Sequence, residues 1–284
     1  MANYTPLRYP GGKGRFYKFL ENIIEQNNLH TENYVEPFAG GAGIAFSMLA
    51  NELVHTVHIN DLNPLIYAFW HSVINQTDDL CRLINDTPVD MENWNAQQQI
   101  KNNPDDHSLL RVGFATFFLN RTNRSGIIDA GVIGGKAQNG IWKIDARFNK
   151  ADLINRIQNI ASYGERVQIY NLDAAALLTE VVPNLSPKTF VYLDPPYYVK
   201  GKGLYQNHFS HNDHERIANL VAKIKQQWLV SYDNVPEISE LYGQYNFLDF
   251  DLKYSAHYRT QGAEIMFFKN GLKIPEPIPI MLRA

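Results

Sequence analysis

Residues 33–49 read NYVEPFAGGAGIAFSML, a β-rich run followed by a glycine-rich turn and an apolar, helix-compatible run. A second β-rich run covers residues 54–59 and ends at Asn60-Asp61, before Pro64, a residue suited to the first turn of a helix. Strands that alternate with helices in this way favour a mostly parallel, three-layer α/β sheet with right-handed crossovers. Further strands are predicted at residues 167–170, 190–193, 228–231, 247–252 and 265–268.

The composition is that of a globular protein with a substantial core. The chain has 284 residues, of which 45% are hydrophobic and 19% are charged, and a formal net charge of −3. These values exclude the disordered, collagen-like and coiled-coil classes. Cys81 is the single cysteine, so no internal disulfide forms and no oxidising compartment is indicated. No apolar run approaches the ~18 residues of a membrane span, and charged residues interrupt the N-terminal region, so we expect a soluble, intracellular protein.

Residues 78–161 break the strand–helix pattern. Asn and Gln are frequent there, and five glycines fall between 126 and 140. We predict an inserted, partly helical domain at 78–161, with 1–77 and 162–284 forming the sheet-bearing domain. The overlapping segment 111–166 holds nine basic and four acidic residues, a net charge of +5 against −8 for the rest of the chain. That asymmetry suits an anionic partner, but an ordinary solvated surface accounts for it equally well.

The glycine-rich turn, residues 38–43, lies between a predicted strand and a predicted helix. Its small residues let a ligand approach the backbone and the helix N-terminus. Asp61 ends the next strand, eighteen residues after Gly43, where a carboxylate can accept hydrogen bonds from both hydroxyls of a ribose. Together these features indicate a nucleoside-containing cofactor without identifying it, since a nicotinamide enzyme places glycines and an acid similarly. The alternative is a tight packing turn that binds no ligand.

Asp194-Pro195-Pro196-Tyr197 directly follows the predicted strand and is the most specific motif in the chain. The two prolines fix two φ angles, and the first confines Asp194 to an extended conformation, so the backbone is rigid. A carboxylate and a neighbouring carbonyl held in this way can accept both N–H bonds of the exocyclic amine of a nucleobase. Tyr197 then supplies an aromatic face for the base. The alternative is a proline turn that merely ends a strand.

A cofactor that reacts with such an amine nitrogen is most simply S-adenosylmethionine. Its sulfonium methyl reacts with a nitrogen without a metal or a covalent intermediate, so positioning is the main requirement. Three histidines, His208, His211 and His214, are spaced three apart, but they surround a predicted helix start capped by Ser210 or Asn212. We therefore predict no metal site and expect Cys81 in the core.

Four motifs in this order resemble the Dam-like (D12 class, alpha group) DNA adenine N6-methyltransferases. They are residues 6–13 (PLRYPGGK), 35–43 (VEPFAGGAG), 60–64 (NDLNP) and 194–197 (DPPY), and the resemblance covers about residues 5–270. It implies a class I S-adenosylmethionine-dependent methyltransferase sheet with a reversed terminal strand and a smaller, mainly helical DNA-recognition insert. It also implies S-adenosylmethionine as the methyl donor and adenine in double-stranded DNA as the acceptor.

The resemblance also assigns residues. Tyr9 stands where well-known members have Trp, a change compatible with stacking, and the glycine turn carries one residue more than the F-x-G-x-G spacing of some members. Asp173 matches an acidic position that binds the cofactor's adenine, but it could equally cap the helix predicted at 174–178. The catalytic residues are expected to be Asp194, Pro195, Pro196 and Tyr197. The expected cofactor contacts are Tyr9, Lys13, Phe38, Gly40, Asp61, Asp173 and Asp194.

The predicted insert contains a run of polar and basic groups that follows an apolar anchor at Phe117-Phe118-Leu119. In the family this region recognises the target site. Arg can read guanine edges, Asn can read adenine, and both can bind phosphate. The residues expected to contact DNA are Asn120, Arg121, Asn123, Arg124, Ser125 and Lys136.

The sequence thus predicts a site-specific DNA adenine methyltransferase that extrudes its target base. An RNA adenine methyltransferase and a catalytically silent DNA-binding protein on the same fold are alternatives, and a nicotinamide dehydrogenase is disfavoured because it leaves the DPPY motif without a task. We expect a monomer or weak dimer in the cytoplasm of a prokaryotic or phage-infected cell, with a cognate restriction endonuclease as a candidate partner.

Overall fold

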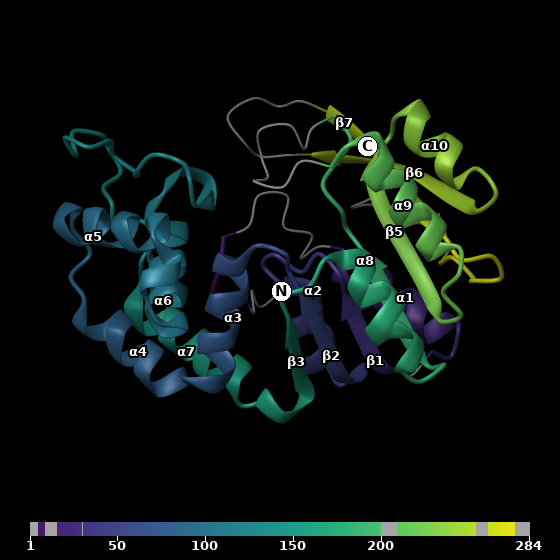
Figure 1. Cartoon of the computed structure of the whole chain (residues 1–284), viewed down its shortest axis with the longest axis horizontal. Coiled ribbons are helices and arrows are strands. Elements are labelled where there is room, and N and C mark those ends of the chain that lie inside the picture. Colours follow the sequence, from purple (N-terminus) through teal and green to yellow (C-terminus); the bar gives the residue numbers. More distant parts are fainter. Residues whose placement is uncertain (1–4, 9–15, 30, 200–208, 254–260, 276–284) are drawn as a thin grey trace. The chain divides into compact units, whose positions relative to one another are not determined.

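The computed structural model describes residues 5–8, 16–29, 31–199, 209–253 and 261–275. The chain forms two compact units. The first comprises residues 1–12 and 63–171, and the second comprises residues 13–62 and 172–284 (Figure 1). Tyr9 and Lys13, two of the expected cofactor contacts, lie outside the described residues.

Within the described ranges the sheet contains seven strands in the order β3-β2-β1-β4-β5-β7-β6. Strands β2, β1, β4 and β5 pair in parallel, whereas β7 runs antiparallel to both β5 and β6. The predicted mixed α/β sheet with a reversed last strand is therefore confirmed. The strands are β1 (Thr31–Glu36), β2 (Val54–Asn60), β3 (Val167–Tyr170), β4 (Thr189–Leu193), β5 (Gln227–Asp233), β6 (Asn246–Lys253) and β7 (Gln261–Phe268).

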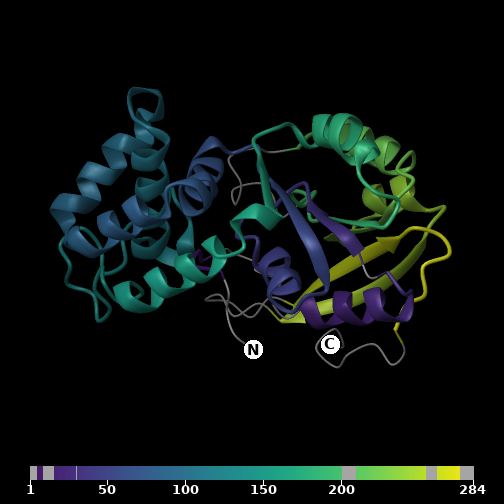
Figure 2. The same cartoon turned by 90° about the horizontal axis from the view of Figure 1, so that it is seen from below.

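Helices of the second unit cover both faces of its strands (Figure 2). Helices α1 and α2 lie against one face, and α8, α9 and α10 lie against the other. Aromatic side chains on the strands form part of the core beneath these helices. Tyr34 of β1 stacks on Phe190 of β4 with ring centroids 6.4 Å apart, and both are fully buried. The helices are α1 (Tyr17–Gln26), α2 (Gly43–Ala50), α8 (Ala174–Ala176), α9 (His211–Val221) and α10 (Pro236–Tyr242).

Capping residues set where the helices begin. Ser210 caps α9, and its hydroxyl and the Asp213 carboxylate form a reciprocal capping box. Asn63 caps α3 by accepting the backbone N–H of Leu65 at 2.9 Å. Pro64 occupies the first turn of α3, where its missing N–H costs nothing. These starts agree with the sequence expectations for both helices.

The first unit is mainly helical, and its core lies between α3 and α6. Gly113 of α6 allows the two helices to approach closely, since a Cβ there would lie 2.5 Å from both the Ala68 carbonyl oxygen and the Ser72 hydroxyl. The longer segment of this unit therefore begins at residue 63, before the predicted insert boundary at 78, because α3 packs on α6. The assignment of 78–161 as a separate domain stays a prediction. The helices are α3 (Pro64–Asn75), α4 (Thr77–Asp86), α5 (Met91–Asn102), α6 (Leu109–Thr122) and α7 (Lys150–Ala161).

Helix length and polarity also bear on membranes. Among the described residues, no helix combines the length and the apolar character needed to cross a bilayer.

Candidate functional site

Two of the acids singled out in the sequence, Asp61 and Asp194, lie at one edge of the second unit's sheet. Strand β1 pairs in parallel with β2 on one side and with β4 on the other. Asp61 directly follows β2, Asp194 directly follows β4, and the glycine turn follows β1 between them. The carboxyl ends of parallel strands form the usual ligand-binding edge of an open α/β sheet. Asp61 and Asp194 therefore lie at the same edge, on either side of β1.

Asp61 holds the glycine turn in place. Its Oδ2 accepts the backbone N–H of Gly40 at 2.9 Å, and the Ala39 N–H donates to the Asn60 carbonyl at 2.8 Å. Gly40 and Ala42 both have a φ of +46°, in the left-handed region that favours glycine. Phe38 packs edge-on against Phe209, with ring centroids 5.8 Å apart. The turn leads directly into α2, which begins at Gly43 and has no side-chain cap.

Asn60 joins three loops at this edge, a role that the sequence did not indicate. It is 1% exposed. Its Nδ2 donates to the Pro37 and Leu172 carbonyls at 2.9 and 3.0 Å, and its Oδ1 accepts the Leu172 N–H at 2.9 Å. The segments after β1 and β3 are therefore held to the end of β2. Every hydrogen-bonding atom of this buried amide is directed at backbone, so a role in ligand contact is not required to explain it.

Glu36, the last residue of β1, is a buried acid that sequence reasoning missed. Its Oε1 accepts the Tyr34 hydroxyl at 3.0 Å and the Ala45 N–H at 3.1 Å. Burial raises the pKa of Glu36 to about 8, and the nearby negative charge of Asp194 adds to the increase. Glu36 is therefore protonated at neutral pH, and Asp194 does not face a second full negative charge.

The DPPY segment is rigidly packed. Asp194 is partly exposed, whereas Pro195, Pro196 and Tyr197 are buried. Ser231 of β5 donates its hydroxyl to Asp194 Oδ1 at 2.9 Å. Tyr197 is only 9% exposed, so little of the ring proposed to stack on a base reaches solvent. Base stacking on Tyr197 stays a prediction.

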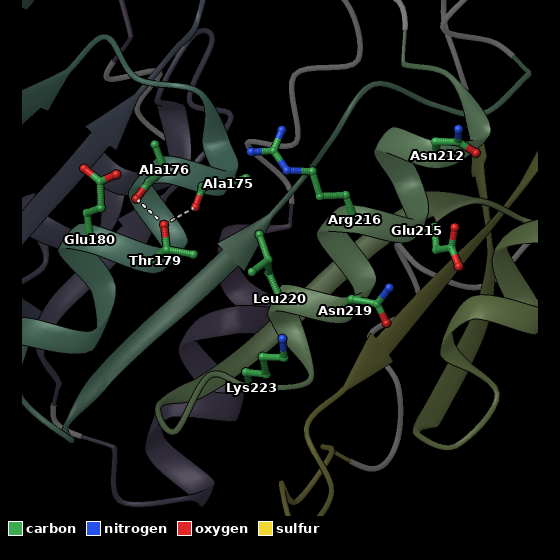
Figure 3. A pocket seen from close by; sticks show the side chains of 10 residues that line it. All are labelled: Ala175, Ala176, Thr179, Glu180, Asn212, Glu215, Arg216, Asn219, Leu220 and Lys223. Atoms are coloured by element: carbon green, nitrogen blue, oxygen red, sulfur yellow. Dashed lines mark hydrogen bonds between the residues drawn. The ribbon is translucent and has the colours of Figure 1, made fainter.

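Asp173 caps α8, one of the two roles considered from the sequence. Its Oδ1 accepts the Ala175 N–H at 2.8 Å and lies 3.7 Å from Arg216 Nη1. Beside it, α8, the π-helical turn at Leu177–Val181 and α9 line a surface groove of about 550 Å³ (Figure 3). Arg216 extends from α9 toward Ala175 and Ala176 in this groove. Neither Asp61, the predicted ribose-binding acid, nor the predicted catalytic Asp194 lines this groove.

Two of the six predicted DNA contacts are buried, which the sequence did not anticipate. Asn120 is 1% exposed and bonds the Arg8 backbone N–H and carbonyl at 2.7 and 2.8 Å. Asn123 is fully buried and accepts the Trp94 indole N–H at 2.7 Å. Asn120 ties α6 to the backbone of Arg8, and Asn123 ties the end of α6 to α5. This placement does not support a DNA contact for either residue.

The remaining predicted contacts are more accessible. Arg121 is half-buried and donates to the Arg147 and Pro6 carbonyls, and burial lowers its pKa to about 10, which leaves it charged at neutral pH. Arg124, Ser125 and Lys136 are exposed.

The first unit also exposes two large apolar residues on an ordered loop, and sequence reasoning missed both. Ile141 is 93% exposed and Trp142 is 68% exposed. The side-chain amide of Gln138 holds the loop together. Its Nε2 donates to the Ile133 carbonyl at 2.8 Å, and its Oε1 accepts the Ile144 N–H at 2.9 Å. An ordered loop that presents an aromatic ring to solvent is a candidate contact surface.

Metal ligands do not gather in the part of the chain that the structure describes, where no group of three or more His, Cys, Asp or Glu side chains could hold an ion. Cys81 is buried in α4. The absence of a metal from the reaction stays a prediction.

Comparison with known proteins identifies the matching family. The family model for D12 class N6 adenine-specific DNA methyltransferases matches residues 9–256. Type II methyltransferase M.CviBI of Paramecium bursaria Chlorella virus NC1A is 24% identical over 281 residues, covering 91% of this chain and 95% of that protein. Type II methyltransferase M.MjaIII of Methanocaldococcus jannaschii is 23% identical over 263 residues, covering 84% and 88%. Among solved structures, the putative methyltransferase yhhF from Escherichia coli aligns with a TM-score of 0.37 at 12% identity over 93% of this chain and 90% of that one.

Proposed function

Because the chain belongs to the D12 class of N6 adenine-specific DNA methyltransferases, we propose that it methylates an adenine extruded from a specific site in duplex DNA, with S-adenosylmethionine as donor. Family membership makes the chain an enzyme that methylates adenine N6 in DNA, on a class I methyltransferase fold. The donor, the extrusion of the base and the roles of individual residues are the finer parts of the proposal.

The edge beside β1 and β2 suits the nucleoside part of the donor. The Asp61 carboxylate is partly exposed and its Oδ2 holds the Gly40 N–H, so the acid and the glycine turn are presented as one rigid surface. Phe38 adds a partly exposed aromatic ring beside them. We assign ribose binding to Asp61 and close backbone approach to Gly40. When bound there, S-adenosylmethionine would supply an electrophilic methyl group.

Asp194 and the Pro195 carbonyl are proposed to bind the target amine. Accepting both N–H bonds favours a pyramidal nitrogen and directs its lone pair at the methyl carbon. The rigid prolines keep the two acceptors in register, and alignment of two reactants can contribute roughly 7–11 kcal/mol to catalysis. The observation that carries the proposal is the placement of Asp61 and Asp194 at the same sheet edge, flanking β1.

DNA binding is proposed for the first unit. Arg124 and Lys136 are exposed cations there, and segment 111–166 carries a net charge of +5, against −8 for the rest of the chain. We propose phosphate contacts for Arg124 and Lys136, and a backbone or groove contact for Ser125. A cognate restriction endonuclease as partner, and the interior of a prokaryotic or phage-infected cell as the location, are part of the same proposal.

The test measures transfer of labelled methyl groups to matched DNA and RNA duplexes. Asp194→Ala and Asp194→Asn should lower the single-turnover rate on DNA by on the order of 10²–10³-fold. Asp61→Ala should instead mainly raise the KM for S-adenosylmethionine. Asp105→Asn, at an exposed position in the first unit, is the control and should behave as wild type.

Three results would contradict the proposal. An active Asp194→Ala variant would remove the acceptor clamp, and preferential methylation of RNA would change the substrate. Salt-sensitive DNA binding by wild type without any methyl incorporation would indicate a silent DNA-binding protein.

A further inference from the structure

The end of β5 contacts the DPPY segment at two separate points. Ser231 and Asp233 are two residues apart on this strand, so their side chains project from the same face. They are 0% and 3% exposed. Neither residue was singled out in the sequence, because the groups that they bind are more than thirty residues away in the chain.

Ser231 binds the reactive side of the segment. Its hydroxyl lies 2.9 Å from Asp194 Oδ1 and 3.0 Å from the Tyr192 hydroxyl. The hydroxyl has a single proton, which it donates to Asp194 Oδ1, so it accepts from the Tyr192 hydroxyl. Burial raises the pKa of Tyr192 well above its ordinary value, which keeps that donor protonated. The hydrogen bonds therefore run in one direction, from Tyr192 to Ser231 and from Ser231 to Asp194.

Asp233 binds the backbone on the other side of Tyr197. Its Oδ1 accepts the Tyr198 N–H at 2.8 Å, and its Oδ2 accepts the Val199 N–H at 2.9 Å. The two residues that follow Tyr197 are thus also attached to β5.

We propose that Ser231 and Asp233 are positioning residues for methyl transfer: Ser231 sets the rotation of the Asp194 carboxylate, and Asp233 sets the backbone that follows Tyr197. This rests on the proposed function of Asp194 as acceptor for the target amine. Each residue acts through the DPPY segment and touches neither substrate. Because a displacement of about 1 Å can cost 10²-fold in rate, loss of either hydrogen-bond set should lower kcat more than it weakens binding.

The first experiment compares Ser231→Ala, Ser231→Thr and Tyr192→Phe in single-turnover methylation of duplex DNA. Ser231→Ala should lose about 10- to 100-fold in rate with the KM for S-adenosylmethionine changed less than about threefold. Ser231→Thr keeps the hydroxyl and should recover most of the rate. Tyr192→Phe leaves the Ser231 donor in place and should have an intermediate effect.

A matched control separates positioning from general loss of stability. Ser72→Ala removes another fully buried hydroxyl, which donates to the Ala68 carbonyl at 2.7 Å in α3 of the first unit. It should lower the melting temperature about as much as Ser231→Ala while keeping the methylation rate. Equal rate losses in Ser72→Ala and Ser231→Ala, or a Ser231→Ala variant with the full wild-type rate, would overturn the role of Ser231.

The second experiment needs no activity and tests Asp233 directly. Hydrogen exchange measured by mass spectrometry on a peptide covering 194–199 should speed up at least tenfold in Asp233→Asn, because one amide of the pair then faces an NH₂ group. If Asp233→Asn does not fold, the same measurement is made on Asp233→Ala. Unchanged exchange in the folded variant would overturn the anchoring role. Inactive wild-type protein with accelerated exchange in the variant would instead reject the proposed function and leave the anchoring intact.

Discussion

Replacing Glu36 by Gln should change how the stability of the protein depends on pH. Burial raises the pKa of this acid from 4.5 to about 8, so the folded protein holds a proton that the unfolded chain releases near its ordinary pKa. Stability from this group is therefore greatest in acid and is lost as the pH rises from about 4.5 to about 8. Gln cannot titrate, and its side-chain oxygen can still accept from the Tyr34 hydroxyl and the Ala45 N–H.

The magnitude follows from the linkage relation. While Glu36 is protonated only in the folded state, the free energy of unfolding falls by about 1.4 kcal/mol per pH unit, and the slope flattens as the pH approaches the folded-state pKa. Between pH 6 and 8 the wild type should lose about 2 kcal/mol through this group. Glu36→Gln should not lose that amount, so its stability relative to wild type should rise by about 2 kcal/mol over the same interval.

Urea unfolding of both proteins at several pH values between 6 and 8 measures the difference. Burial also lowers the pKa of His58, to about 4, but both proteins carry His58 and its contribution cancels in the comparison. A difference between the two stabilities that stays constant from pH 6 to 8 would mean that Glu36 is not protonated in the folded protein.

Three shorter predictions concern the first unit. Gly126→Ala should destabilise the protein by more than about 2 kcal/mol in urea unfolding, because φ is +76° and a Cβ would lie 2.3 Å from the Arg8 carbonyl oxygen; a cost below about 0.5 kcal/mol would contradict the close approach. Arg124→Gln should weaken DNA binding and reduce the slope of log affinity against log salt by about 1, whereas an unchanged slope would exclude a phosphate contact. DNA should alter the tryptophan fluorescence of wild type and not of Trp142→Phe, because the other three tryptophans are buried; an equal response from both would place Trp142 outside the interface.

Local sequence patterns were sufficient to predict the strand ends and helix starts. The β-rich runs at residues 54–59 and 190–193 correspond to β2 and β4, and Ser210 caps α9 as one of the two expected positions. Parallel strands present their carboxyl ends at one edge of a sheet. The ends of these strands were therefore enough to predict that Asp61 and Asp194 lie at the same edge. This part of the site follows from short-range rules and fold class.

Burial of polar side chains was not predictable in the same way. Asn120 lies in a run of polar and basic residues that reads like a DNA-contacting surface, yet nearly all of α6 is buried, so that no solvent-facing stripe exists to host it. Its amide binds the backbone of Arg8, 112 residues away in the chain. Similarly, Ser231 and Asp233 act on groups that β-sheet pairing brings close. Only tertiary structure decides which polar residues become internal hydrogen-bond partners.

Polar side chains at the strand ends of the second unit hold backbone before any ligand is bound. Glu36 binds the first turn of α2, Asn60 binds the segments after β1 and β3, Asp61 binds the glycine turn, and Asp233 binds the backbone after Tyr197. Dipoles and acceptors that are already in place need no reorganisation when the reaction occurs. The same hydrogen bonds also stabilise the folded state, so a substitution that removes one of them should reduce stability and activity together, whereas one at an exposed cation such as Arg124 should change DNA affinity alone. We therefore expect stability and catalysis to be coupled at the sheet edge and separable on the proposed DNA-binding surface.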